Sequence, residues 1–139
     1  GHPPICYEDG QQLRDYVYVG DVARANVLVM EDQRADFHAF NVGGQTGTTV
    51  LEYAHLAARV IDPNIEPLVS GDFRFGDTRH TVSSWEMLGA LGWCPEVSLE
   101  NVIAKYAEWV RQQPDLGDFY AETEEKMRAA NIIRRAQSS

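Results

Sequence analysis

The sequence has little cysteine, no long apolar run and too few basic residues to balance its acids. Its 139 residues include two cysteines, Cys6 and Cys94, which are too few for a disulfide framework and predict reduced thiols in a cytoplasm. Charges or glycines interrupt every hydrophobic stretch before the ~18 residues that a membrane-spanning helix needs. The opening residues also lack the pattern of an export signal. These absences predict a soluble protein with no membrane partner.

The shortage of basic residues narrows the choice of ligand. Twelve Lys and Arg residues stand against 21 Asp and Glu, giving a formal net charge of −9 and a pI near 4.8. Such a surface repels phosphate backbones, so we expect no nucleic-acid partner. The four histidines lack metal-ligand spacing, so no metal site is expected. A small anion remains possible if a few arginines converge in one pocket.

The size and the pattern of the sequence predict one α/β domain. Hydrophobic residues make up 44% and charged residues 24%, an ordinary globular mixture. Strand-like and helix-like segments alternate, but three or four strands are few for a parallel sheet, which needs both faces covered. The chain is therefore expected to be part of a larger fold. The expected strands are 5–7, 15–19, 39–42 and 66–70.

Capping residues place the expected helices. Thr49 and Glu52, like Ser83 and Glu86, have the spacing of a capping box, and Ser98 and Asp21 are single caps. Apolar residues then recur at helical spacing. The expected helices run from Asp21 to about Glu31, from Thr49 to Ile61, from Ser83 to Gly92, from Ser98 to Pro114, and from Asp118 to about Arg135.

A glycine-rich turn, Gly43-Gly44, lies between an expected strand and a helix start. Backbone amides in such a turn can receive phosphates. The turn is not G-x-G-x-x-G, and no acidic residue follows on a second strand about 20 residues later. We therefore favour a structural role for these glycines over a phosphate-binding one.

Arginines in two segments are the stronger candidates for anion binding. Arg14 and Asp15 precede an expected strand, and residues 72–80 form an irregular loop with two arginines and two acids. Loop arginines in an acidic protein usually form surface ion pairs of little energy. The functional alternative is that their guanidinium groups match the oxygens of a diphosphate, with an aspartate to orient them. From the residues alone, the ion-pair interpretation is favoured.

The order of several blocks resembles a known family. Residues 7–25, which include Arg14-Asp15-Tyr16-Val17-Tyr18-Val19, are followed by Phe40-Asn41-Val42-Gly43 and by Arg74-Phe75-Gly76-Asp77-Thr78-Arg79-His80. Together they resemble the C-terminal substrate-binding portion of extended short-chain dehydrogenase/reductases. The similarity is to NAD-dependent nucleotide-sugar epimerases and dehydratases of the UDP-glucose 4-epimerase type, and it extends to about Gln113.

This resemblance implies a fold and a set of site residues. The implied fold is a small α/β substrate-binding domain, 1–139, with few short strands, about five helices and an incomplete Rossmann part. Residues 14–31 would pack on an absent NAD-binding domain, and 115–139 would form a helical tail. Carried over by position, Arg14 and Arg74 would bind the substrate diphosphate and Asp77 the ribose hydroxyls. Tyr7 would lie at the edge of the base, and Val50 would pack against the pyrimidine.

The family's catalytic residues are missing from this sequence. Its members oxidise a sugar by hydride transfer to NAD, using a Tyr-x-x-x-Lys pair as the base. None of the six tyrosines here has a lysine four residues later, so no catalytic and no cofactor-binding residue is assigned. The resemblance thus implies a UDP- or dTDP-sugar-binding fragment that is inactive alone, its partner being the N-terminal Rossmann domain. The alternative is a free-standing, non-catalytic module for nucleotide sensing or protein interaction.

Overall fold

The computed structural model describes residues 2–114, 117 and 119–135. In these residues five α-helices and six short strands follow one another, which confirms an α/β chain with few strands. The helices are α1 (Val19–Glu31), α2 (Val50–Ile61), α3 (Glu86–Gly89), α4 (Leu99–Arg111) and α5 (Tyr120–Ala129), with a short 3-10 helix η1 (Gln33–Ala35). The strands are β1 (Ile5–Cys6), β2 (Leu13–Arg14), β3 (Thr48–Thr49), β4 (Leu68–Val69), β5 (Asp72–Arg74) and β6 (Ile133–Arg135).

The strands form three separate two-stranded ladders. β1 pairs with β4 in parallel, β2 with β3 antiparallel, and β5 with β6 antiparallel. The β2–β3 ladder sets Leu13 opposite Thr49 and Arg14 opposite Thr48. The β1 and β4 positions agree with the strands expected near 5–7 and 66–70. Isolated two-stranded ladders are marginal by themselves, so the helices packed around them must supply stability.

Two of the predicted helix starts are confirmed in detail. Thr49 caps α2: its side chain accepts from the Glu52 N–H, and the Glu52 carboxylate accepts from the Thr49 N–H at 2.8 Å. Ser98 caps α4 by accepting from the N–H of Asn101. The other two caps are wrong. α1 begins after Tyr18, without a side-chain cap, and α3 begins after Trp85.

The strands expected at 15–19 and 39–42 are also wrong. Residues 15–18 and 39–42 are irregular, Val19 already belongs to α1, and β2 ends at Arg14, before the first of these segments begins. A strand needs a neighbouring strand to pair its backbone, and nothing in the described chain pairs with residues 39–42. Phe40 and Val42 nevertheless pack on the core. The apolar side chains of this segment therefore pack on the core, although its backbone pairs with no strand of the described chain.

The predicted C-terminal helix ends earlier than expected. Its start at Asp118 lies outside the described residues, and α5 stops at Ala129 instead of continuing to about Arg135. Asn131 has φ +56°, in the left-handed region that ends a helix. The chain then returns as β6 beside β5. The terminal segment is a helix–strand unit rather than a single helix.

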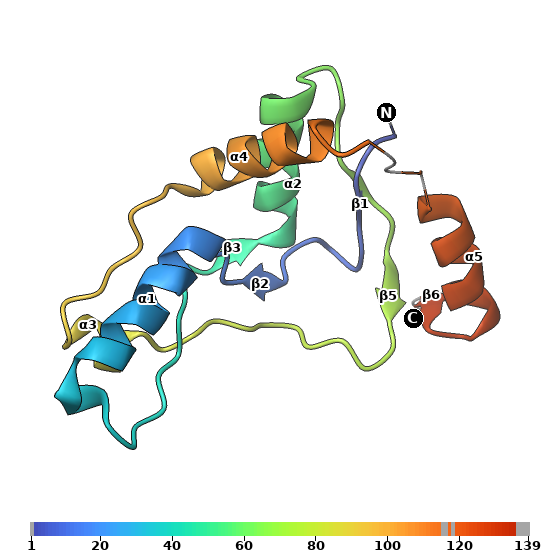
Figure 1. Cartoon of the computed structure of the whole chain (residues 1–139). Coiled ribbons are helices and arrows are strands. Elements are labelled where there is room, and N and C mark those ends of the chain that lie inside the picture. The colour runs from blue at the N-terminus through green and yellow to red at the C-terminus, as the bar shows by residue number, and fades with distance from the viewer. Residues whose placement is uncertain (1, 115–116, 118, 136–139) are drawn as a thin grey trace.

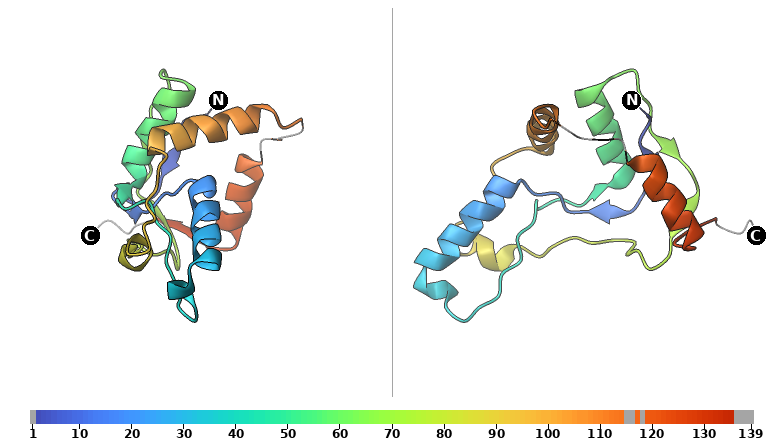
Figure 2. Two further views of the ribbon diagram at one scale, coloured as in Figure 1. Left: turned by 60° about the vertical axis from the view of Figure 1, so that its left-hand side comes forward. Right: turned by 45° about the vertical axis from the view of Figure 1, so that its right-hand side comes forward.

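A small core lies between α1 and α3. It consists of Ala25, Leu88 and Trp93, each at most 3% exposed, with partly buried apolar residues around them. Figures 1 and 2 show α1 and α3 at one end of the molecule and α5 with β6 at the other, with α2 and α4 packed together. No helix in the described residues has the length and apolar character needed to cross a bilayer. The β2–β3 ladder lies between the two ends.

Candidate functional site

Arg14 and Asp77, distant in sequence, meet at the end of β2. The Arg14 Nη2 donates to Asp77 Oδ1 at 3.2 Å, and the Arg14 Nη1 donates to the backbone oxygens of Leu13 and Arg79 at 2.8 and 3.0 Å. The Arg14 side chain is 26% exposed and that of Asp77 48%. An ion pair this open contributes little stability by itself. It remains accessible to a ligand that competes for the guanidinium.

A tight turn brings Arg74 beside Asp77. The two residues are the first and last of a β-turn, in which the Asp77 N–H donates to the Arg74 oxygen at 3.2 Å. Gly76 in this turn has φ +83°, which favours glycine over every other residue. The Arg74 guanidinium lies over the Tyr7 ring, with its carbon 4.9 Å from the ring centroid. Arg14, Asp77, Arg74 and Tyr7 therefore form one continuous group.

Gln12, a residue the sequence reasoning missed, connects Tyr7 to Val50. Its Nε2 donates to the Tyr7 oxygen at 2.9 Å, and its own backbone oxygen accepts from the Val50 N–H at 2.9 Å. Val50 is the half-buried first residue of α2. Gln12 is 6% exposed, and its Oε1 has no hydrogen-bond partner in the described structure. The five predicted site residues thus lie around one buried glutamine and one open ion pair.

Arg79 is a second residue whose position the sequence did not reveal. It forms ion pairs with Glu8 and with Asp9, the latter at 2.7 Å. The bond from Arg79, followed by one from the Gln11 N–H, lowers the pKa of Asp9 to about 2. Arg79 therefore joins the loop that follows Tyr7 to the loop that carries Asp77. Two adjacent acids and a distant loop arginine are too common a pattern to predict this contact.

The residues after Arg79 run alongside β2. The Leu13 N–H donates to His80 Nδ1 at 3.3 Å, and the Thr81 N–H donates to the Leu13 oxygen at 3.1 Å. Together with the bond from Arg14 to the Arg79 oxygen, these contacts fix the loop against the ladder. They explain why Asp77 reaches Arg14.

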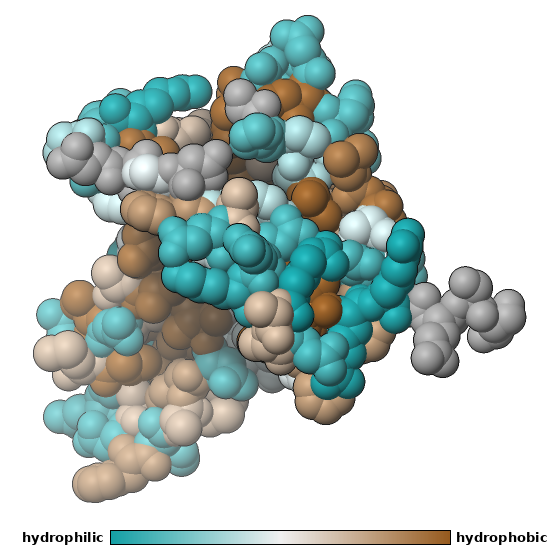
Figure 3. Space-filling view, turned by 90° about the vertical axis from the view of Figure 1, so that its right-hand side faces the viewer, coloured by the Kyte–Doolittle hydropathy of each residue, from teal (hydrophilic) through white to brown (hydrophobic). Residues whose placement is uncertain are grey.

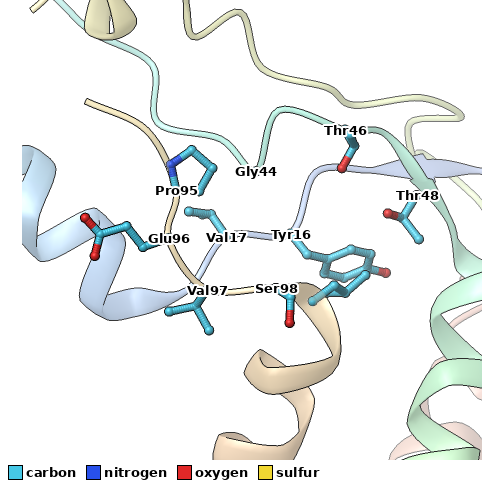
Figure 4. Close-up of a pocket in the computed structure, with 10 residues that line it drawn as sticks. Tyr16, Val17, Gly44, Thr46, Thr48, Pro95, Glu96, Val97 and Ser98 are labelled. Atoms are coloured by element: carbon cyan, nitrogen blue, oxygen red, sulfur yellow. The ribbon is translucent and has the colours of Figure 1, made fainter. Parts of the chain in front are cut away.

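A pocket of about 240 Å³ lies next to the charged group without including it. Its walls come from the segments at Tyr16–Val17, 44–48 and 95–99, as Figure 4 shows. Thr48, in its wall, is the ladder partner of Arg14. The Tyr16 ring stacks on Tyr53 with 4.2 Å between ring centroids. The pocket and Arg14 therefore share the β2–β3 ladder as a common support.

The glycine turn has the structural role favoured from the sequence. The Asp15 carboxylate accepts from the Gly44 N–H at 2.5 Å and from the Ser83 N–H at 3.1 Å. A Cβ at Gly43 would lie 2.1 Å from Asp15 Oδ2, and one at Gly44 would lie 2.1 Å from the Tyr16 oxygen. Asp15 thus holds this turn instead of orienting Arg14. With the Gly44 amide occupied by Asp15, this turn does not fit a phosphate, and the described residues contain no cluster of metal ligands.

Comparison with known proteins identifies the family. Residues 1–43 match the model of the NAD-dependent epimerase/dehydratase family. Among curated relatives, a dTDP-L-rhamnose 4-epimerase from Burkholderia thailandensis is 39% identical, covering 78% of this chain and 30% of its own length. A UDP-glucose 4-epimerase from Lacticaseibacillus casei is 32% identical over 78% of this chain and 34% of its own length. The chain spans about a third of the length of these relatives.

Solved structures agree with this result. A UDP-glucose 4-epimerase from Thermotoga maritima, determined with UDP-glucose, has a TM-score of 0.71 and 37% identity, covering 79% of this chain and 35% of that one. An epimerase from Methanothermobacter thermautotrophicus has the same TM-score at 20% identity, covers 93% of this chain and 36% of that one, and supports the fold alone. The chain therefore belongs to the NAD-dependent epimerase/dehydratase family, and its fold is a partial domain of that family.

Proposed function

We propose that this chain is the substrate-binding portion of an NAD-dependent nucleotide-sugar epimerase or dehydratase. Arg14 and Arg74 bind the diphosphate of a UDP- or dTDP-sugar, and Asp77 accepts hydrogen bonds from the ribose. Tyr7 and Val50 lie at the base. NAD and the catalytic Tyr/Lys pair belong to an N-terminal Rossmann domain, so this chain alone is inactive.

The observation that carries the proposal is the meeting of Arg14, Asp77 and Arg74. Arg14 pairs with the Asp77 carboxylate, and a backbone turn places Arg74 three residues before Asp77, so two arginines lie near one carboxylate in a protein of net charge −9. Guanidinium groups suit diphosphate oxygens because they donate paired, charge-assisted hydrogen bonds. A diphosphate can replace Asp77 as the partner of Arg14, which frees that carboxylate for a ribose hydroxyl.

The surface of α1 supports a partner domain. Asp21 and Ala25 face the inside of the chain, whereas Val19, Val27 and Met30 are 75%, 53% and 83% exposed. These three residues fall along one stripe of the helix. An exposed apolar stripe on a helix that is already buried on its other side is typical of an interface. We assign this stripe to the N-terminal domain, as residues 14–31 were expected to pack.

Replacing Arg14 with alanine tests the proposal. We expect the Arg14→Ala chain to lose about 1.5–3 kcal/mol of UDP or dTDP binding free energy, a weakening on the order of ten- to hundredfold. The reason is the loss of charge-assisted bonds to the diphosphate. Titration calorimetry measures the change. Arg34→Ala is the matched control, because the bonds that the described structure gives to the Arg34 guanidinium all go to the nearby Asp32. Equal affinities for Arg14→Ala and wild type would remove Arg14 from the site.

A further inference from the structure

The C-terminal unit, α5 with β6, packs against the strand that ends in Arg74. β6 pairs with β5 so that Ile133, 4% exposed, lies opposite Arg74. The Phe75 N–H donates to the Ile132 oxygen at 2.8 Å, which continues the contact past the end of the strand. Figures 1 and 2 show α5 and β6 beside β5.

Arg128 on α5 forms a side-chain ion pair with Asp72 of β5. Its Nη2 lies 2.8 Å from Asp72 Oδ2 and 2.7 Å from Glu124 Oε1. Asp72 is 8% exposed, so its carboxylate depends on this partner. Asp72 and Arg74 project from the same face of β5 because they are two residues apart. The ion pair between Arg128 and Asp72 therefore fixes the face of β5 from which Arg74 also projects.

The free backbone edge of β5 and the Arg74 side chain both contact the residues around Tyr7. The Glu8 N–H donates to the Asp72 oxygen at 2.6 Å, and Arg74 lies over the Tyr7 ring. On α5, burial raises the pKa of Tyr120 to about 12, with further contributions from Glu124 and from the Tyr7 phenol. The C-terminal unit thus interacts with both residues of the Arg74–Tyr7 pair, through β6 and through Tyr120. Hydrophilic side chains cover the centre of the face that carries α5 (Figure 3).

We propose that the C-terminal unit is part of the nucleotide-diphosphate site and that Arg128 is its positioning residue, holding Asp72 and hence Arg74 in the orientation that receives the diphosphate. Arg128 does not contact the ligand. Arg74 binds a ligand only under the function proposed above, so this role rests on that function. The C-terminal unit then contributes to the affinity of the site for its ligand. The other members of the site lie at least 40 residues earlier in the chain.

The test compares UDP binding to Arg128→Gln, Arg128→Lys and Lys126→Gln by titration calorimetry. We expect Arg128→Gln to weaken binding about three- to tenfold through the loss of one positioning contact, and Arg128→Lys to restore most of it. Lys126→Gln removes an exposed ion pair to Glu122 on the same helix and should leave the affinity unchanged. In an Arg74→Ala background, Arg128→Gln should have no further effect, because its influence passes through Arg74.

Two results with Arg128→Gln would overturn this role of Arg128. One is that Arg128→Gln leaves the affinity for UDP unchanged while Arg14→Ala weakens it. The proposed function would then stand, but without a role for the C-terminal unit. The other is that Arg128→Gln weakens UDP binding equally in the wild-type and the Arg74→Ala backgrounds. If Arg128→Gln does not fold, Glu124→Gln loosens Arg128 while leaving Asp72 paired, and it should weaken binding in the same direction; no change would equally overturn the role. If the wild-type chain does not bind UDP, the proposed function itself fails.

Discussion

Replacing Asp21 with alanine should destabilise the chain by about 1–3 kcal/mol, because it removes a buried carboxylate that accepts from two backbone amides. The Asp21 carboxylate accepts from Arg24 at 2.9 Å and from the backbone N–H groups of Glu96 and Val97 at 3.1 and 3.2 Å. Its side chain is 3% exposed. Without it, two backbone amides lose their acceptor, and Arg24 keeps only Glu96 and the Cys94 oxygen among the partners in the described residues. Urea unfolding followed by circular dichroism measures the loss, with the exposed Asp36→Ala as a control of equal charge.

The pH dependence of this effect follows from the pKa of Asp21. Burial opposes ionisation, but the bonds from Arg24, Val97 and Glu96 together lower the pKa of Asp21 below its usual value of 3.8. A lowered pKa in the folded state contributes stability above the unfolded pKa, and this stability is lost as the pH falls through the folded value. The difference in unfolding free energy between wild type and Asp21→Ala should therefore be constant at neutral pH and shrink below about pH 4. A constant difference down to pH 2 would contradict this account.

The Leu88→Ala substitution should cost about 2–5 kcal/mol of unfolding free energy, since it leaves a cavity in a small core. Leu88 is 0% exposed and packs with Ala25 and Trp93 between α1 and α3. A domain with so few fully buried apolar residues has little stability to spare. Met87→Ala, one residue away and 53% exposed, is the matched control for the helix. Similar losses for the two variants would show that this core does not hold the two helices together.

The helices could be predicted because their signals are local. The capping box at Thr49 and Glu52 lies within one turn of helix, and so does the cap at Ser98. Strands depend on partners far away in the sequence, and this explains why 15–19 and 39–42 were misassigned. β6 could not be predicted for the same reason. Its partner β5 lies about 60 residues earlier, and the charge pattern before it is that of a continuing helix.

The resemblance names the candidate site residues, but the sequence does not give the contacts between them. The resemblance supplied Arg14, Arg74 and Asp77, whereas composition alone favoured surface ion pairs. In the structure Arg14 pairs with Asp77, as the ion-pair interpretation expects, and a backbone turn joins Asp77 to Arg74. Gln12 and Arg79 were missed because their roles depend on contacts to separate loops. No spacing rule in the sequence encodes such contacts.

The most direct test compares UDP with uridine as ligands of the wild-type chain and of the Arg14→Ala/Arg74→Ala double variant, by titration calorimetry. If two guanidinium groups receive the diphosphate, the wild type should bind UDP more than about tenfold tighter than uridine, and the double variant should lose that preference. Equal affinity of the wild type for UDP and uridine, or a preference that survives both substitutions, would contradict the assignment of this site.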